Sequence, residues 1–174
     1  MVVSHPMTGN SGLSPSTVSL TCGFYNVPVI GISNRDSSLS NKNIHSLFAR
    51  MISPFSHQAD VWIEILKQFK YHSVVFIHSQ DSDGRATLGR FQHLADDANI
   101  KIEALIEYEP GISDVVRELQ NAKDEYCSVF ILYANTEDAE SIFREVNALN
   151  MTEPGFVWIV SEQVTIDVND NMII

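Results

Sequence analysis

The sequence predicts an α/β fold in which four parallel strands form a doubly wound sheet between helices. Apolar runs begin near residues 74, 102, 129 and 156. The run at 74–77 is unbroken and rich in β-branched residues, which is typical of a strand buried on both faces. Stretches with apolar residues at helical spacing lie between the runs. The near-constant period of about 27 residues fits a strand-plus-helix unit with a right-handed crossover. The L-x-x-L-x-L pattern of leucine-rich repeats is absent.

The first of these units shows the pattern most clearly. Residues 57–70 predict a helix with one apolar face, formed by Val61, Ile65, Leu66 and Phe69. The unbroken apolar run 74–77 predicts a buried strand. The segment Asp81-Ser82-Asp83-Gly84 ends that strand. We expect Ser82 or Asp83 to cap the next helix, because side-chain oxygens of Ser and Asp accept hydrogen bonds from its unpaired first amides.

The first 50 residues predict less regular structure. Residues 4–19 are rich in Ser, Thr, Gly, Asn and Pro, which predicts a loop. Residues 27–32 predict a short strand, and residues 33–43 a second polar loop. Residues 44–51 are expected to be a short helix or an extended connector. Since one strand and two loops cannot close a core, we expect this part to pack against structure from outside the chain.

Composition narrows the function. The 174 residues are 44% hydrophobic and 19% charged, with a net charge of −11, which argues against binding nucleic acid or an anionic membrane surface. No apolar run is long enough to span a membrane, and no signal peptide is evident. The chain ends on Met172-Ile173-Ile174 without a return element, so we expect it to be a fragment of a longer protein that folds poorly alone.

Motifs for catalysis, cofactors and metals are missing. The sequence has no G-x-G-x-x-G, P-loop or G-x-S-x-G motif. The segment that begins at Asp81 resembles a calcium loop, but Arg85 takes the fifth position and no glycine takes the sixth. None of the six histidines forms a pair at i, i+4. We therefore predict no catalytic residue, no metal and no cofactor.

A ligand crevice is conceivable at the carboxyl ends of the strands, where ligands bind in open α/β sheets. The candidate cleft residues at these ends are Ser79, Asp81, Tyr133, Asn135 and Glu162. Because polar residues are expected at any strand end, these positions alone do not select ligand binding. Asn150-Met151-Thr152 is an acceptor sequence for N-glycosylation and is expected in a surface turn.

Several segments in one order resemble the amino-terminal domain of ionotropic glutamate receptors. The resemblance is to the NMDA type, in its glycine-binding obligatory subunit class and an invertebrate form. It rests on segments 3–6 (VSHP), 23–31 (GFYNVPVIG), 54–62 (PFSHQADVW), 83–86 (DGRA), 149–152 (LNMT) and 155–160 (GFVWIV). It spans nearly the whole chain with few gaps.

The resemblance implies a fold similar to periplasmic binding proteins, a clamshell of two lobes. Residues 1–53 would end the first lobe, 54–57 would cross between the lobes, 58–163 would form the second lobe, and 164–174 would begin the return. Such a domain lies outside the cell in a plasma-membrane receptor of synapses, here postsynaptic. Its membrane-spanning part would belong to the missing chain.

The resemblance also implies a function in assembly. In this subunit class the first lobe contacts other NMDA receptor subunits, and small allosteric modulators bind at that interface. The matching positions are Leu20, Phe24, Asn43, Ile44 and Ser46. Leu20 stands where the family often has tyrosine, and Ser46 where it often has leucine, so dimer contact is better supported than modulator binding. Alternatively, Phe24 and Ile44 simply cover the core of the lobe.

Three further inferences complete the prediction. The family's amino-terminal disulfide has no matching cysteines, so Cys22 and Cys127 should not pair with each other. Rotation of the second lobe about the crossing near Pro54 would shift the equilibrium of the channel gate. The alternative function is the ligand-binding lobe of a periplasmic-type amino-acid-binding protein or receptor.

Overall fold

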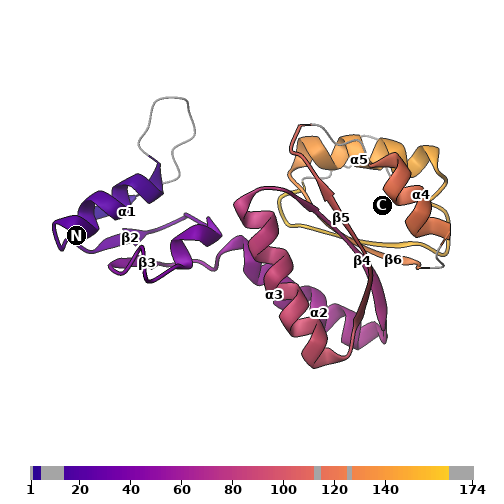
Figure 1. Ribbon diagram of the computed structural model, residues 1–174, viewed down its shortest axis with the longest axis horizontal. Coiled ribbons are helices and arrows are strands. Elements are labelled where there is room, and N and C mark those ends of the chain that lie inside the picture. The colour runs from indigo at the N-terminus through magenta and orange to yellow at the C-terminus, as the bar shows by residue number, and fades with distance from the viewer. Residues whose placement is uncertain (1, 5–13, 112–114, 125–126, 165–174) are drawn as a thin grey trace. The chain divides into compact units, whose positions relative to one another are not determined.

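The computed structural model describes residues 2–4, 14–111, 115–124 and 127–164. The chain divides into two compact units, Met1–His57 (unit 1) and Gln58–Ile174 (unit 2). Figure 1 shows their elements along the chain. Among the described residues, no helix combines the length and the apolar character that crossing a bilayer requires.

Unit 2 contains the predicted parallel sheet. Its strands lie in the order β5-β4-β6-β7, and every neighbouring pair is parallel. Their bounds are β4 Ser73–Ser79, β5 Lys101–Tyr108, β6 Val129–Tyr133 and β7 Val157–Val160. Each strand starts within one residue of its predicted position, and the predicted order of elements in this region is confirmed.

Helices cover both faces of this sheet, as a doubly wound fold requires. The helices are α2 (Gln58–Phe69), α3 (Ser82–Ala98), α4 (Val116–Asp124) and α5 (Thr136–Ala148). Helices α2 and α3 lie on one face, and α4 and α5 lie on the other (Figure 1).

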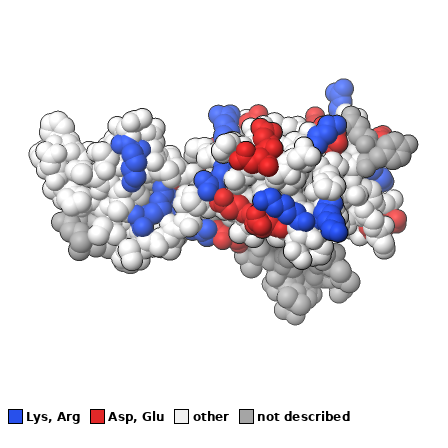
Figure 2. All heavy atoms as spheres, turned by 90° about the horizontal axis from the view of Figure 1, so that it is seen from below, with Lys and Arg blue, Asp and Glu red and all other residues white. Residues whose placement is uncertain are grey.

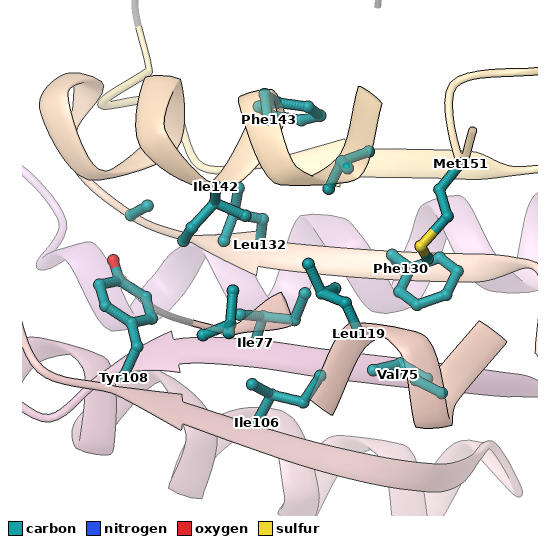
Figure 3. Close-up of a cluster of buried hydrophobic side chains, with 14 of the residues drawn as sticks. Val75, Ile77, Ile106, Tyr108, Leu119, Phe130, Leu132, Ile142, Phe143 and Met151 are labelled. Carbon is teal, nitrogen blue, oxygen red and sulfur yellow. The ribbon is translucent and has the colours of Figure 1, made fainter. Parts of the chain in front are cut away.

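The side chains of β4 show how both faces are buried. Val75 and Ile77 point into the cluster beneath α4 and α5 (Figure 3). Phe76 points the other way, where its ring lies 4.8 Å from that of Phe91 on α3 and 5.9 Å from that of Trp62 on α2. Because successive residues of a strand face opposite sides, a strand buried on both faces must be apolar throughout. This explains the unbroken apolar run in the sequence.

Unit 1 holds more regular structure than the sequence predicted. Its three strands, β1 (Val2–Ser4), β2 (Val29–Gly31) and β3 (Phe48–Arg50), form a parallel sheet in the order β1-β2-β3. Two 3₁₀ turns follow β2 and β3, η1 (Ser37–Ser40) and η2 (Phe55–His57). Residues 44–51, predicted as a helix or a connector, therefore contain a strand.

The prediction of a loop over residues 4–19 was wrong for the described residues from Pro15 on. Helix α1 spans Pro15–Phe24. Ser14 caps it by accepting a hydrogen bond from the Thr17 amide at 3.2 Å. Pro15 suits the first position of a helix, where an amide hydrogen would find no partner. Packing of Val18 and Cys22 on the core of unit 1 outweighs the weak helix propensity of Ser and Thr.

The cap of α3 was predicted one or two residues too late. Ser82 and Asp83 lie inside the helix, and Asp81 caps it instead. Its Oδ1 accepts a hydrogen bond from the Gly84 amide at 2.6 Å while its own backbone is extended. All three residue types are good caps, so the sequence alone does not select between them.

Candidate functional site

The five interface candidates lie on the surface of unit 1. Side chains of Phe24, Ile44 and Leu20 are 82%, 56% and 49% exposed, and Asn43 and Ser46 are also exposed. We call these five residues the apolar patch. Neither Phe24 nor Ile44 belongs to the buried core cluster of unit 1, which consists of Val29, Leu39 and Phe48.

The patch draws on two segments of the chain that a buried hydrogen bond joins. Leu20 and Phe24 come from α1, and the other members come from the turn that precedes β3. Ser19 Oγ and His45 Nδ1 lie 3.0 Å apart beneath them, and both residues are buried. Each is the sequence neighbour of a patch residue, so this bond fixes the two halves of the patch relative to each other.

Ser19→Ala is expected to lower the free energy of unfolding by about 1–3 kcal/mol, because the buried His45 nitrogen would lose its partner. Ser16→Ala on the same helix is the control, since Ser16 is only half-buried; it should be near neutral. Urea denaturation of the complete amino-terminal domain measures both. Equal effects of the two substitutions would show that the hydrogen bond contributes nothing.

The cleft candidates gather at one end of the sheet in unit 2. A cavity of ≈ 240 Å³ opens there, at the point between β4 and β6 where the chain changes direction across the sheet. It is lined by Ser79, Asp81, Asp83, Tyr108, Tyr133, Asn135, Asp138 and Gln163. Four of the five candidates are therefore brought together, at the location where open α/β sheets bind ligands.

Two helices begin at this cavity, and their caps are part of its wall. Asp81 caps α3, and its Oδ2 also accepts a hydrogen bond from Ser79 Oγ at 2.9 Å. Asn135 caps α5 by accepting a hydrogen bond from the Asp138 amide at 2.8 Å. The buried Asp138 carboxylate accepts from the Gly111 amide and from Asn135 Nδ2. Asp81 and Asn135 therefore cap helices and line the cavity at the same time.

Two buried tyrosines complete the wall. Burial, followed by the charge of Asp138, raises the pKa of Tyr108 well above its usual value. Burial, followed by the charge of Asp83, does the same to the pKa of Tyr133. Both phenols therefore stay neutral. Among the described residues that line the cavity, three are aspartates and none is Lys or Arg. The cavity therefore suits a cationic group better than the carboxylate of an amino acid.

Glu162 does not line the cavity. Its side chain is exposed, and its amide donates a hydrogen bond to Gln58 Oε1 at 2.9 Å. Sequence reasoning missed Tyr108, although it ends a predicted strand just as Tyr133 does. It also missed Asp83, Asp138 and Gln163, which lie a few residues beyond strand ends. Including the first helical turn in the search would have found the two aspartates.

Gly84, the sequence neighbour of the cavity residue Asp83, has no room for a side chain. A Cβ there would lie 2.2 Å from the Ser79 carbonyl oxygen, whereas at Gly89 of the same helix it would meet nothing within 4 Å. Gly84→Ala should therefore destabilise the fold by about 1–3 kcal/mol. The matched control, Gly89→Ala, should stabilise it by about 0.5–1 kcal/mol. Urea denaturation would contradict this prediction if both substitutions had the same sign.

The sequon lies in an exposed turn directly after α5. Asn150 and Thr152 are exposed, and the Asn150 backbone is left-handed, with φ 54°. Met151 between them is buried, and its carbonyl accepts a hydrogen bond from Trp158 Nε1 at 3.0 Å. The turn is thus anchored by its middle residue while its two flanking side chains face solvent, as the sequence predicted.

Both cysteines carry free thiols: Cys127 is buried at the start of β6, and Cys22 is half-buried on α1. Within the described ranges, no three His, Cys, Asp or Glu side chains gather closely enough to hold a metal ion.

Comparison with known proteins agrees with the fold. The family described as "Receptor family ligand binding region" matches residues 8–172. The chain is 48% identical over 169 residues to "Glutamate [NMDA] receptor subunit 1" of Drosophila ananassae and of Drosophila melanogaster. Each alignment covers 94% of this chain and 17% of the relative. These relatives are receptor subunits and not enzymes. The chain therefore belongs to the family of receptor ligand-binding regions, and it resembles an NMDA-type amino-terminal domain.

Proposed function

We propose that this chain is part of the extracellular regulatory and assembly domain of an NMDA-type glutamate-gated cation channel subunit. The observation that carries this proposal is the apolar patch of unit 1. The five residues that the family resemblance assigns to the subunit interface are all exposed, and they come from two segments joined by a buried bond. An apolar group that is exposed in the isolated chain gains most from burial against a partner.

In this proposal, the patch contact changes during gating. The buried hydrogen bond joins the two segments of the patch, so a shift of the partner would act on both segments together. If the contact is more favourable in one state of the gate than in the other, it shifts the equilibrium toward that state. The size of the shift equals the difference between the two contact free energies. A small allosteric modulator would act by adding contacts in one of these states only.

Co-expression tests this proposal directly. The complete amino-terminal domain, secreted alone and together with the same domain of other NMDA receptor subunits, is analysed by sedimentation. We expect a heterodimer to form at micromolar concentrations. Independent sedimentation of the two domains at every concentration would contradict the proposal.

A second candidate function is binding of a small ligand by unit 2. The cavity at the strand ends favours this function. However, the aspartates that line the cavity would attract a cation and repel the carboxylate of an amino acid. Calorimetry of the complete domain with glutamate and with glycine separates the candidates. Binding in the millimolar range or tighter would favour an amino-acid-binding lobe over a purely allosteric function.

The sequon gives a test of the extracellular location. We expect Asn150→Gln to remove one glycan from the receptor expressed in insect cells, because Asn150 and Thr152 are both accessible. Thr152→Ser is the matched control, since serine preserves the acceptor sequence. Electrophoresis with and without glycosidase measures the change. Identical mobility of the Asn150→Gln protein and the parent protein would contradict this prediction.

A further inference from the structure

The two units differ in formal charge. Residues 1–57 contain three basic residues, Arg35, Lys42 and Arg50, and one acidic residue, Asp36. The remaining residues contain eight Lys and Arg against 21 Asp and Glu. In the view of Figure 2, the Lys and Arg side chains of unit 1, at the left, are surrounded by uncharged groups. A positive unit in a strongly acidic chain requires an explanation, since net charge alone does not favour it.

Two of these three basic residues line one hollow, which follows β3. Its volume is ≈ 410 Å³, within the range of small-molecule sites. The lining consists of Leu39, Ser40, Lys42, Arg50, Met51, Ile52, Ser53, Pro54 and His57. Among these described residues there are two permanent cations and no carboxylate. Two serines and an imidazole add further groups that can donate hydrogen bonds.

The guanidinium of Arg50 is held in a fixed orientation. Its Nη1 donates to the Asp36 carbonyl at 2.9 Å, and its Nη2 donates to Ser40 Oγ at 2.9 Å. It also lies over the ring of Phe48, 5.6 Å from the centroid. Lys42 Nζ donates to the Phe48 carbonyl. These contacts order both long side chains in advance, which lowers the entropic cost of binding a ligand.

We propose that this hollow binds a small ligand through an oxyanion, either a carboxylate or an inorganic oxyanion. Lys42 and Arg50 supply the charge, and the planar guanidinium matches the geometry of such groups. The apolar side chains of Leu39, Ile52 and Pro54 give the same hollow a surface for a short carbon chain. None of the lining residues belongs to the apolar patch, although Lys42 is next to Asn43 in the sequence, and the site does not depend on the proposed assembly function.

Hydrogen–deuterium exchange of the full-length subunit tests the proposal, because it reports on local segments within the intact protein. Exchange is measured with inorganic sulfate, with succinate, and with chloride alone at constant ionic strength. We expect sulfate, succinate or both to slow the exchange of residues 49–53 by about threefold or more relative to chloride. Slowing by both anions identifies an oxyanion site, and slowing by succinate alone adds recognition of the carbon chain. No slowing by either anion would overturn the proposal.

Variants separate this site from a general effect of anions. Lys42→Gln and Arg50→Gln should each abolish the slowing. Arg35→Gln is the matched control: it removes a cation from the same unit, but Arg35 does not line the hollow. Lys42→Gln leaves the Arg50 hydrogen bonds intact, so it stays informative if the Arg50 variant folds poorly. Equal slowing in the parent protein and in Lys42→Gln would overturn the assignment.

Discussion

Replacing Phe24 by aspartate in the complete domain is expected to weaken its association with a partner NMDA receptor subunit by about 2 kcal/mol or more, roughly thirtyfold in Kd. Phe24 is 82% exposed on α1, so aspartate costs the isolated domain little. In the proposed interface the same carboxylate would be buried without a partner, and the contact area of the ring would be lost. Sedimentation equilibrium of the mixed domains measures the change.

Phe69→Asp provides the matched control for this substitution. Phe69 is 64% exposed near the end of α2, and like Phe24 it contacts a neighbouring tyrosine ring. It lies in unit 2, outside the proposed interface. A loss of association in Phe69→Asp as large as that in Phe24→Asp would point to nonspecific charge effects. If the Phe24→Asp variant associates as strongly as the parent domain, the patch is not part of the interface.

Phe130→Ala is expected to destabilise unit 2 by about 3–5 kcal/mol, which is the usual cost of truncating a fully buried aromatic side chain. Phe130 lies on the central strand β6 with no solvent exposure. Its ring stacks on Trp158 of β7 at 4.6 Å and lies among the side chains shown in Figure 3. The cavity left behind cannot close easily, because strands on both sides fix its walls. Urea denaturation of the complete domain measures the loss.

The control is again an exposed phenylalanine. Phe69→Ala removes the same atoms from a side chain that is mostly in solvent, and it should change the free energy of unfolding by less than about 1 kcal/mol. A loss of similar size in both variants would mean that burial in the unit 2 core does not determine the cost. A loss below about 1 kcal/mol for Phe130→Ala would show that the core is loosely packed.

The sequence predicted unit 2 well because its two central strands are buried and its apolar runs recur at a regular spacing. A strand such as β4 that is covered on both faces carries an apolar run that no surface element imitates. Helix α1 in unit 1 was missed because its sequence carries no clear helical pattern. Ser and Thr residues give it little intrinsic preference for a helix, so its existence depends on packing against β2 and β3. Tertiary packing of this kind has no local sequence pattern. The only local indication of the helix is Ser14 followed by Pro15, a typical helix start.

The candidate sites divide in the same way. The cleft residues could be grouped from the sequence, since parallel strands place their carboxyl ends at one edge of a sheet. Tyr133 and Asp81 follow that rule. Glu162 does not follow it: the residue comes two positions after the end of β7 and is exposed. The hollow beside Lys42 and Arg50 was not predictable, because the 3₁₀ turn at residues 37–40 and the loop after β3 meet only in the folded chain.

The hydrogen bond from the Glu162 amide to Gln58 Oε1 joins the first residue of unit 2 to a residue just after its last described strand. These positions are 104 residues apart in the chain. If Gln58 is displaced at the start of unit 2, this hydrogen bond passes the displacement directly to Glu162. The four-stranded sheet does not have to deform for this to happen. The two ends of the described part of unit 2 are thus joined directly, in addition to their connection through the sheet.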